Sequence, residues 1–418
     1  MMDGMATSAT MSQQAVETTS YAPGRVVSVD LLRGLTVALM ILVNDPGDWD
    51  HVFRQLDHAD WSGWTLTDLV FPTFLFVMGV AMVFSMDARE ARGDSQWARA
   101  GKVVSRAAKI FALDLILAYF PGMHWTRMRF YGVLTRIALC YLLAGLTLLA
   151  TKRVRVLAAI VAVILVGYWV MLRWVPVPGA GMPVRNFPLL DPLNNWTSWI
   201  DRGVVHFTQH WMHTGRLYRK VSDPEGLLST LPATATTLLG VLAGFWMQKI
   251  AHAGVGTEAR LRMRSTQKML TLVGAAGIVL GEVWSIWFPI NKNLWTSSYV
   301  LLAAGVAALA LAACSWLVDG RPQPWPRWMQ VATWPWLVYG SNAIAAFVFS
   351  EALVITMIRI KITDSDGDKH SLWALSYENV FARHGSTDWT SLAFAVTYVL
   401  ICFVPMWLLW RKKIFLRV

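Results

Sequence analysis

The sequence predicts an all-α integral membrane protein with about ten transmembrane helices. Of its 418 residues, 55% are apolar and only 15% are charged, and the mean hydropathy is +0.43. Soluble domains carry about 25% charged residues. A helix needs about 20 mostly apolar residues to cross a bilayer. Segments of this kind lie at 26–45, 65–86, 101–120, 130–150, 155–174, 226–248, 267–289, 295–318, 330–357 and 388–410.

Each segment is expected to form a continuous helix, because an unpaired backbone amide in hydrocarbon costs several kcal/mol. Neither a broken span nor an internal repeat, both typical of secondary transporters, is expected here.

Charge in the connections predicts the orientation of these helices, since cytoplasmic loops are rich in Lys and Arg. The connection that follows the second segment is basic, as is every second connection after it. The first connection is acidic instead, with five aspartates (Asp45, Asp48, Asp50, Asp57 and Asp60) against Arg54. Both termini are therefore expected in the cytoplasm and His58 outside. The net charge of +11 mostly reflects this bias, which favours contact with anionic lipid over nucleic acid.

The chain is expected to consist of a disordered cytoplasmic tail, 1–24, and one transmembrane domain, 25–418. The tail lacks the basic start and apolar core of a cleaved signal, so the first span is expected to serve as the insertion signal. Two outer segments are long, 175–225 and 358–387. The first begins with Pro and Gly and continues with Trp196, Trp199 and Trp211, which suit a membrane interface and a lid over an outer site.

The three cysteines and three of the nine histidines can be explained by structural roles alone. Cys140, Cys314 and Cys402 lie within spans, so neither a disulfide nor a metal-thiolate site is expected. Three outer histidines share one helical face and could bind zinc, but no acid or cysteine accompanies them, and an amphipathic interfacial helix explains them as well. They are His206, His210 and His213. No metal is expected.

Ionisable residues inside spans are expensive and therefore candidates for function. Asp30 and Arg33 are three residues apart, so they can pair with each other or hold a ligand. Arg136 has no local partner and must face a carboxylate, a cavity or an anionic ligand. Asn342 and Glu351 either line the same cavity as Arg136 or form a structural polar network.

His58 is the strongest catalytic candidate, because it lies at a membrane edge between Asp57 and Trp61. Histidine exchanges protons near neutral pH. A hairpin of two helices with the loop folded back would bring Asn44, His58 and Asp68 together. His58 could then take a proton or an acyl group, and Asn44 could orient a carbonyl or an oxyanion.

Five runs of the sequence resemble the transmembrane acetyltransferase family of heparan-alpha-glucosaminide N-acetyltransferase, and they look most like its shorter bacterial members. The runs are SVDLLRGLTVALMILVN, HADWSGWTLTDLVFPTFLFVMG, YGVLTRIALCYL, SDPEGLLSTLPATATTLLG and PINKNLWTSSYV. The resemblance weakens in the tail, the outer loops and the last span.

The resemblance implies transfer of an acetyl group from cytoplasmic acetyl-CoA to the amine of a glucosamine-like sugar outside a bacterial inner membrane. His58 matches the family's active histidine, and Asn44 matches its asparagine at the start of the loop. His58 would act as general base or as acetyl acceptor, and Asp57 or Asp68 could orient its ring. Three charged residues also match family positions and are candidates for binding acetyl-CoA, Arg33 through its phosphates: Asp30, Arg33 and Arg136.

Two further runs are candidate contacts for the acceptor. In the SDPEG run, Asp223 and Glu225 either cap the sixth span or contact the substrate. The tight turn at 289–295 could hold sugar hydroxyls or merely satisfy helix ends. The candidate acceptor-binding residues are therefore Trp61, Asp223, Glu225, Asn291, Lys292, Asn293, Trp295, Asn342 and Glu351.

Two alternative functions stay open at this point: a proton-coupled small-molecule transporter, and an acyltransferase that acts on a lipid-linked glycan. Large helical membrane proteins often pair, so a homodimer is a candidate assembly, although nothing in the sequence identifies an interface.

Overall fold

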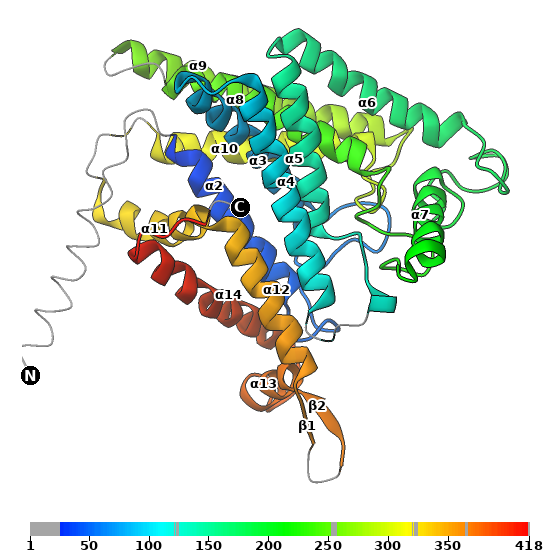
Figure 1. Ribbon diagram of the computed structural model, residues 1–418. Helices are drawn as coiled ribbons and strands as arrows, with labels where there is room; N and C mark the ends of the chain where they lie inside the picture. The colour runs from blue at the N-terminus through cyan, green and yellow to red at the C-terminus, as the bar shows by residue number, and fades with distance from the viewer. Residues whose placement is uncertain are drawn as a thin grey trace, which may run out of the picture.

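The computed structural model describes residues 26–120, 122, 125–251, 257–319, 321, 325–363 and 367–416, and nearly all of them are helical (Figure 1). The expected tail, 1–24, lies outside the described residues. The long helices are α2 (Val27–Asn44), α3 (Leu66–Ala91), α4 (Gln96–Tyr119), α5 (Val133–Ala150), α6 (Val154–Trp174), α8 (Thr230–Ala251), α9 (Thr257–Ser285), α10 (Ser297–Val318), α11 (Arg327–Ser341), α12 (Ala343–Arg359) and α14 (Asp388–Arg411).

Short elements fill the two long connections that were expected outside. The first contains α7 (Trp196–Met212), and the second contains an antiparallel pair of strands, β1 (Lys361–Thr363) and β2 (Lys369–Ser371), followed by α13 (Leu372–Val380). A single 3-10 turn, η1 (Trp125–Arg127), precedes α5.

The prediction of an all-α polytopic membrane protein is confirmed. In the described part of the chain, eight helices are long and apolar enough to cross a membrane: α2, α3, α5, α6, α8, α9, α10 and α14. The bent pair of α11 and α12 makes a ninth if it is counted as one span. The expected segment 101–120 is also helical, as part of α4, but it is not among these spans, because it carries Lys102, Arg106, Lys109 and Asp114.

The expectation of one continuous helix over 330–357 is wrong, because α11 and α12 meet at an angle of 80°. The carbonyl of Gly340, which a continuous helix would use internally, accepts a hydrogen bond of 2.8 Å from Arg33 Nε. Asn342 at the break binds the end of the chain instead: its Nδ2 donates to Ile414 O at 3.1 Å, and its Oδ1 accepts from Leu416 N at 2.8 Å. Tertiary contacts therefore satisfy the polar groups that the break leaves open.

Two helices in the centre of the bundle, α3 and α8, approach each other through glycines. A Cβ on Gly79 would lie 2.0 Å from Thr237 O, and a Cβ on Gly240 would lie 2.0 Å from Phe76 O. Without the glycines the two backbones could not come so close, and packing of this kind holds membrane helices together. The first turn of α3, which carries Asp68, is thereby fixed against α8.

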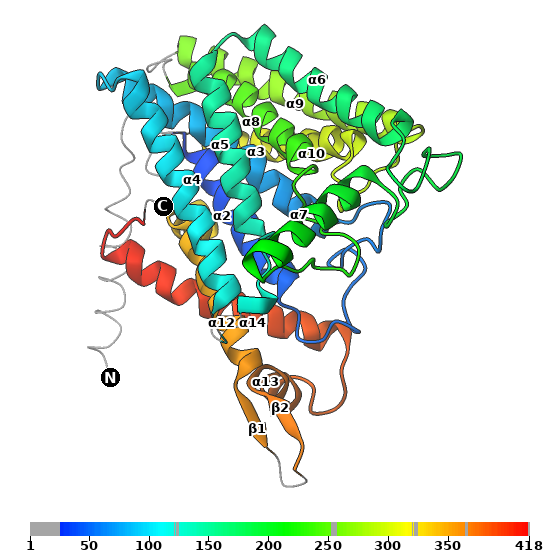
Figure 2. The same ribbon diagram turned by 45° about the vertical axis from the view of Figure 1, so that its right-hand side comes forward.

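The connections 45–65, 175–229 and 286–296 gather at one end of the bundle, which we call the His58 end. Both views show the 45–65 loop beside α7 (Figure 1, Figure 2). The opposite end holds basic residues: Lys152 pairs with Glu90, and Arg99 Nη1 lies 3.2 Å from Glu90 Oε2. The three cysteines are buried in helices and free, as expected.

Candidate functional site

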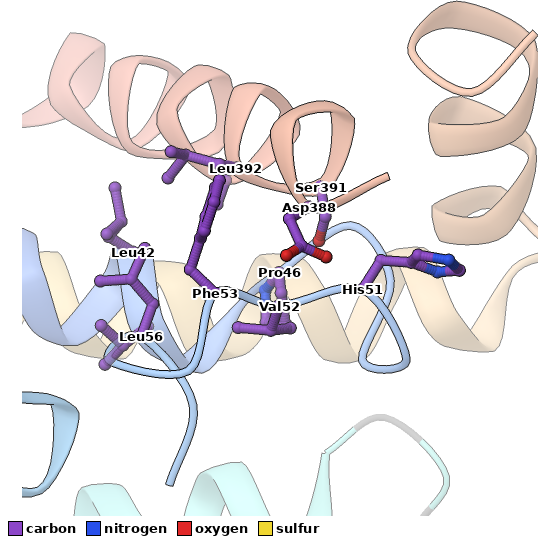
Figure 3. Close-up of a pocket in the computed structure, with 11 residues that line it drawn as sticks. Leu42, Pro46, His51, Val52, Phe53, Leu56, Asp388, Ser391 and Leu392 are labelled. Atoms are coloured by element: carbon purple, nitrogen blue, oxygen red, sulfur yellow. The ribbon is translucent and has the colours of Figure 1, made fainter. Parts of the chain in front are cut away.

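The loop that carries His58 is anchored on both sides. Its first half packs on α14: the rings of Phe53 and Trp389 meet edge to face at 4.9 Å, and Phe53 points toward Leu392 (Figure 3). The hollow at this contact measures only about 10 Å³, room for about one water molecule. We therefore regard it as a packing contact that fixes the loop, and not as a ligand site.

The second half of the loop is tied to the start of α3 by a capping box. Asp68 Oδ2 accepts hydrogen bonds from Thr65 N at 3.0 Å and from Ala59 N at 3.1 Å. Thr65 Oγ1 in turn donates to Asp57 O at 2.6 Å. An acid at this helix position also benefits from the helix dipole. Asp68 is therefore both a structural cap and a fixed carboxylate.

The other oxygen of Asp68 meets His58 and Lys292. Asp68 Oδ1 lies 2.9 Å from His58 Nδ1 and 3.3 Å from Lys292 Nζ. The Asp68 side chain is 1% exposed, whereas 38% of the His58 side chain is exposed. The predicted contact between His58 and Asp68 is observed, and the imidazole is accessible while its partner is not.

Lys292 reaches the same imidazole from the turn between α9 and α10. Its Nζ lies 2.9 Å from His58 Nδ1 and 3.5 Å from Nε2. The two loops are joined by their backbones, since Gly63 N donates to Ile290 O at 2.8 Å. Burial lowers the pKa of Lys292, and the charges of Asp68 and Glu225 oppose that shift. The Lys292 amine thus lies against both Asp68 and the imidazole of His58.

These contacts decide which nitrogen of His58 can act as a base. Nδ1 faces both Asp68 Oδ1 and the Lys292 amine. An ionised carboxylate only accepts hydrogen bonds, so Nδ1 carries the proton when it binds Asp68, and Lys292 Nζ then donates to the same Oδ1 at 3.3 Å and not to Nδ1. The lone pair then lies on Nε2. Asp57 has no part in this arrangement, because its Oδ1 accepts the backbone N–H of His58 at 2.7 Å. Of the two acids considered from the sequence, Asp68 orients the ring.

A second polar cluster lies beside the first and is centred on Arg129. Its guanidinium donates to Asp223 Oδ2 at 2.8 Å and to Asp223 Oδ1 and Glu225 Oε2 at 2.5 Å each. Burial raises the pKa of Asp223, and Arg129 opposes the shift. Burial would also raise the pKa of Glu225, but the cations of Arg129 and Arg136 outweigh it and hold that pKa below its usual range. Both acids are thus part of an ion-pair network.

Arg136 joins the two clusters, since it donates to Gly226 O at 3.0 Å, next to Glu225, and lies over the ring of Trp295 in the turn that carries Lys292. We call the combined group the polar site. It consists of His58, Asp68, Arg129, Arg136, Asp223, Glu225 and Lys292. The residues come from four loops at the His58 end and from the first turns of α3 and α5.

Arg136 lies in this site and not with the other predicted acetyl-CoA contacts. It is fully buried, donates to Gly226 O at 3.0 Å and to Ser229 Oγ, and lies with its Cζ 4.9 Å from the centre of the Trp295 ring. Its Nε and Nη1 have no hydrogen-bond partner in the described part of the chain. Trp295 has a left-handed backbone, φ 53°, and donates its Nε1 to Thr236 Oγ1 at 3.2 Å.

The turn that carries Lys292 is held by its own side chains. Asn291 is fully buried, and its Oδ1 accepts from Leu294 N at 2.8 Å. Asn293 is half-buried. Trp61 is half-buried and donates its Nε1 to Leu190 O at 2.7 Å. Asn291 therefore shapes the turn, while Asn293 and Trp61 stay partly accessible.

Asp30 and Arg33 form the ion pair that their spacing predicts, with Arg33 Nη2 2.7 Å from Asp30 Oδ1. The same guanidinium binds Gly340 O. Asn44, the last residue of α2, is half-buried, and no hydrogen bond joins it to His58 or Asp68 among the described residues. The structure therefore does not show the predicted convergence of Asn44 with His58 and Asp68.

Asn342 and Glu351 do not join the polar site. Asn342 has its structural partners at the end of the chain, as described above. Glu351 lies near Asp45 at the end of α2, where burial and then the charge of Glu351 raise the pKa of Asp45 well above its usual value. For Asn342 the structural alternative is the observed one.

No group of three or more His, Cys, Asp or Glu side chains in the described ranges could hold a metal ion. The three outer histidines are included in that finding: His206 and His210 lie on α7, and His213 ends it in a left-handed conformation, φ 53°.

Several residues of this region were not predicted from the sequence to belong to the site. Arg129 was the main omission, although the two arginines Arg127 and Arg129 in a connection expected outside were a signal. Tyr299, within one of the five family-like runs, donates from Oη to Asp68 O at 2.5 Å. Asp201 on α7 accepts from Leu227 N at 2.9 Å, and burial raises its pKa to about 7. Asp201 Oδ2 and Tyr131 Oη are buried without a partner among the described residues.

Comparison with known proteins agrees with the geometry. The family model described as "Heparan-alpha-glucosaminide N-acetyltransferase, catalytic" matches residues 25–280. Human heparan-alpha-glucosaminide N-acetyltransferase is 28% identical over 97% of this chain, and the mouse protein of the same name is 28% identical over 96%. The chain spans 62% of the length of each of these relatives. Because the family model matches more than half of the chain, and its matched range includes His58, Asp68, Arg129, Arg136, Asp223 and Glu225, the chain belongs to the family of heparan-alpha-glucosaminide N-acetyltransferase catalytic domains.

Proposed function

We propose that this protein is an acetyl-CoA-dependent transmembrane N-acetyltransferase that acetylates the amine of a glucosamine-like sugar. The observation that carries the proposal is the contact of an accessible imidazole with a buried carboxylate, at 2.9 Å, in a chain of this family. The names of the human and mouse relatives describe a glucosaminide as acceptor, and amine acetylation needs a base of this kind.

His58 would remove the proton that blocks the reaction. A sugar ammonium has no free electron pair, so it must lose a proton before its nitrogen can attack a thioester carbonyl. Asp68 holds the proton of His58 on Nδ1, which leaves Nε2 free to accept the proton of the ammonium. Because Asp68 is itself fixed by Ala59 and Thr65, the ring needs little reorganisation.

The acidic part of the polar site is suited to the same acceptor. Glu225 lies between the cations of Arg129 and Lys292, and its side chain is 13% exposed. A sugar ammonium that approaches His58 would find a carboxylate there, and its hydroxyl groups would find donors in Lys292 and Asn293. The predicted acceptor contacts at Glu225 and Lys292 fit this arrangement, whereas the side chain of Asp223 is fully buried and binds Arg129.

The donor would come from the opposite end of the bundle. Acetyl-CoA supplies the acetyl group as an activated thioester. Arg33, whose side chain is 26% exposed, is our candidate for its phosphates, although its present partners are Asp30 and Gly340. We place the His58 end outside the cytoplasm, because the acidic 45–65 loop lies there and the basic connections lie at the other end. The resemblance to bacterial members suggests an inner membrane.

The broken span favours a second function, a proton-coupled transporter, because discontinuous helices often line transport sites. Here the polar groups of Asn342 at the break bind Ile414 and Leu416. We therefore rank transport second, and its test is uptake of amino sugars by liposomes in a pH gradient.

The first experiment is transfer of labelled acetyl from acetyl-CoA to glucosamine by purified protein in liposomes, with His58→Ala as the variant. We expect loss of transfer in the variant while acetyl-CoA binding survives. An intact protein that neither binds acetyl-CoA nor acetylates any amino sugar would refute the proposal. Pre-steady-state release of CoA without an acceptor distinguishes the two roles of His58: a burst equal to the enzyme concentration indicates that the acetyl group moves to His58, and no burst indicates a general base.

A further inference from the structure

A cavity of about 480 Å³ opens beside α7, next to the polar site. Its lining includes four cations and no carboxylate, together with two side chains of α7 that can donate hydrogen bonds. The residues are Arg202, Arg216, Arg219 and Lys220, with His206 and Gln209. A concave surface with charge of one sign concentrates ions of the opposite sign.

The four cations are not used in ion pairs with carboxylates anywhere in the described part of the chain. Arg202 is positioned by carbonyl groups, since its Nη1 donates to Leu193 O at 2.8 Å and to Val221 O at 3.2 Å. Arg219 lies over the Trp61 ring, with its Cζ 5.6 Å from the ring centre. By contrast, the nearby Arg129 forms ion pairs with two carboxylates, those of Asp223 and Glu225. The cavity therefore keeps uncompensated positive charge.

Two contacts join the cavity to the polar site. Trp61, beneath Arg219, lies three residues after His58 in the same loop. Tyr218, which lines the cavity, lies under the Arg129 guanidinium at 4.9 Å, and its backbone N–H donates to Asp223 Oδ2 at 2.9 Å. A molecule in the cavity would thus lie next to the residues that we assign to the acceptor.

A third observation concerns the face of α7 that turns away from the protein. Trp199, Phe207 and Trp211 are 40%, 59% and 68% exposed and lie eight and four residues apart on one side of the helix, whereas Asp201 and Val205 on the other face are buried. An amphipathic helix with exposed aromatic residues beside a basic surface is typical of the membrane interface. The cavity is therefore placed at the level of lipid headgroups.

We propose that this cavity is a phosphate-binding subsite for an acceptor anchored in the membrane, an amino sugar linked to lipid through a phosphate. The inference rests on the proposed function and names its substrate class. Guanidinium groups bind phosphate oxygens through paired, charge-assisted hydrogen bonds. The phosphate would occupy the cavity, the lipid would follow the aromatic face of α7, and the amine would reach His58 past Trp61.

The test compares three acceptors with full-length protein in micelles: glucosamine, glucosamine 1-phosphate and a long-chain alkyl phosphodiester of glucosamine. We expect the alkyl phosphodiester to have a KM about tenfold or more below that of glucosamine, as one strong charge-assisted contact would give. The double variant Arg216→Gln/Lys220→Gln should bring the ratio of the two KM values toward one. Arg185→Gln, which removes an exposed cation of the same connection outside the cavity, should leave the ratio unchanged.

Equal KM values in the wild type, or a ratio that the double variant retains, would overturn the subsite. A KM for glucosamine 1-phosphate as low as that of the alkyl phosphodiester would overturn the membrane anchor and assign the cavity to soluble sugar phosphates. Equilibrium binding of glucosamine 1-phosphate without acetyl-CoA provides an independent readout. If no acceptor is acetylated at all, the proposed function fails, and loss of this binding in the double variant still decides whether the cavity holds phosphate.

Discussion

Replacing Asp68 with asparagine tests whether this carboxylate fixes the protonation state of His58. Asp68 Oδ2 accepts two backbone N–H groups, from Ala59 and Thr65. The amide oxygen of an asparagine must take that place, because an amide NH₂ there would face two donors. The NH₂ group then points at His58 Nδ1 and at the amine of Lys292.

The consequence is a change of tautomer. Nδ1 then has no acceptor beside it and faces two donors, the new amide NH₂ and the Lys292 amine. It becomes an acceptor, and the proton of the neutral imidazole moves to Nε2, which can no longer take a proton from the acceptor amine. General-base catalysis contributes about 10²- to 10⁴-fold, so the barrier should rise by about 3–5 kcal/mol. The amide oxygen of the asparagine can still accept from Thr65 N, so α3 should keep its capping box.

The assay is acetyl transfer to glucosamine in liposomes under single-turnover conditions, with acetyl-CoA binding and the thermal midpoint measured in parallel. Asp57→Asn is the matched control, because Asp57 lies beside His58 but binds only its backbone N–H. The reasoning is refuted if Asp68→Asn retains activity within about threefold of wild type. It is also refuted if the control loses as much activity as Asp68→Asn.

Three further predictions concern groups around the imidazole. Lys292→Met removes an amine 2.9 Å from His58 Nδ1 and 3.3 Å from Asp68 Oδ1; acetyl transfer should slow by about tenfold or more, as the loss of one hydrogen bond to a charged group predicts, and an unchanged rate would contradict this. Arg129→Ala leaves two buried carboxylates unpaired and should cost about 3–5 kcal/mol of unfolding free energy, seen as a lower thermal midpoint, whereas Arg129→Lys should recover part of the loss. Asp201 has a pKa raised to about 7 by burial, so the folded state holds its proton more tightly than the unfolded chain and stability should fall as pH rises from about 4 to about 7, by at most about 4 kcal/mol. Asp201→Asn should flatten the dependence of the thermal midpoint on pH, and an equally steep slope would show that other groups cause it.

The parts of the fold that depend on local sequence could be predicted. Runs of apolar residues locate the helices, and the contact between His58 and Asp68 spans only ten residues across one loop. The network around Arg129 could not be predicted in the same way, because its partner Asp223 lies 94 residues away. The sequence predicted Asp223 and Lys292 as candidate acceptor contacts. Their position near His58, however, depends on how the helices pack.

The predictions that differ from the structure also depend on contacts between distant parts of the chain. The run at 330–357 is mostly apolar, and its Gly340, Ser341 and Asn342 permit a break without requiring one. The break depends on Arg33, which binds Gly340 O, and on the end of the chain, which binds Asn342. Arg136 matches the family pattern, but the pattern alone does not say which end of the bundle its guanidinium faces. Burial under Trp295 places it in the polar site.

The contact between Lys292 and His58 joins residues 234 positions apart, and this separation has a consequence for biosynthesis. A nascent chain that has inserted α2 and α3 already holds the pair of His58 and Asp68. The amine arrives only after α9 has entered the membrane and the turn before α10 has formed. Chains truncated before this turn therefore remain as membrane-bound fragments that lack the Lys292 amine. Such fragments should have no transferase activity even if they escape proteolysis.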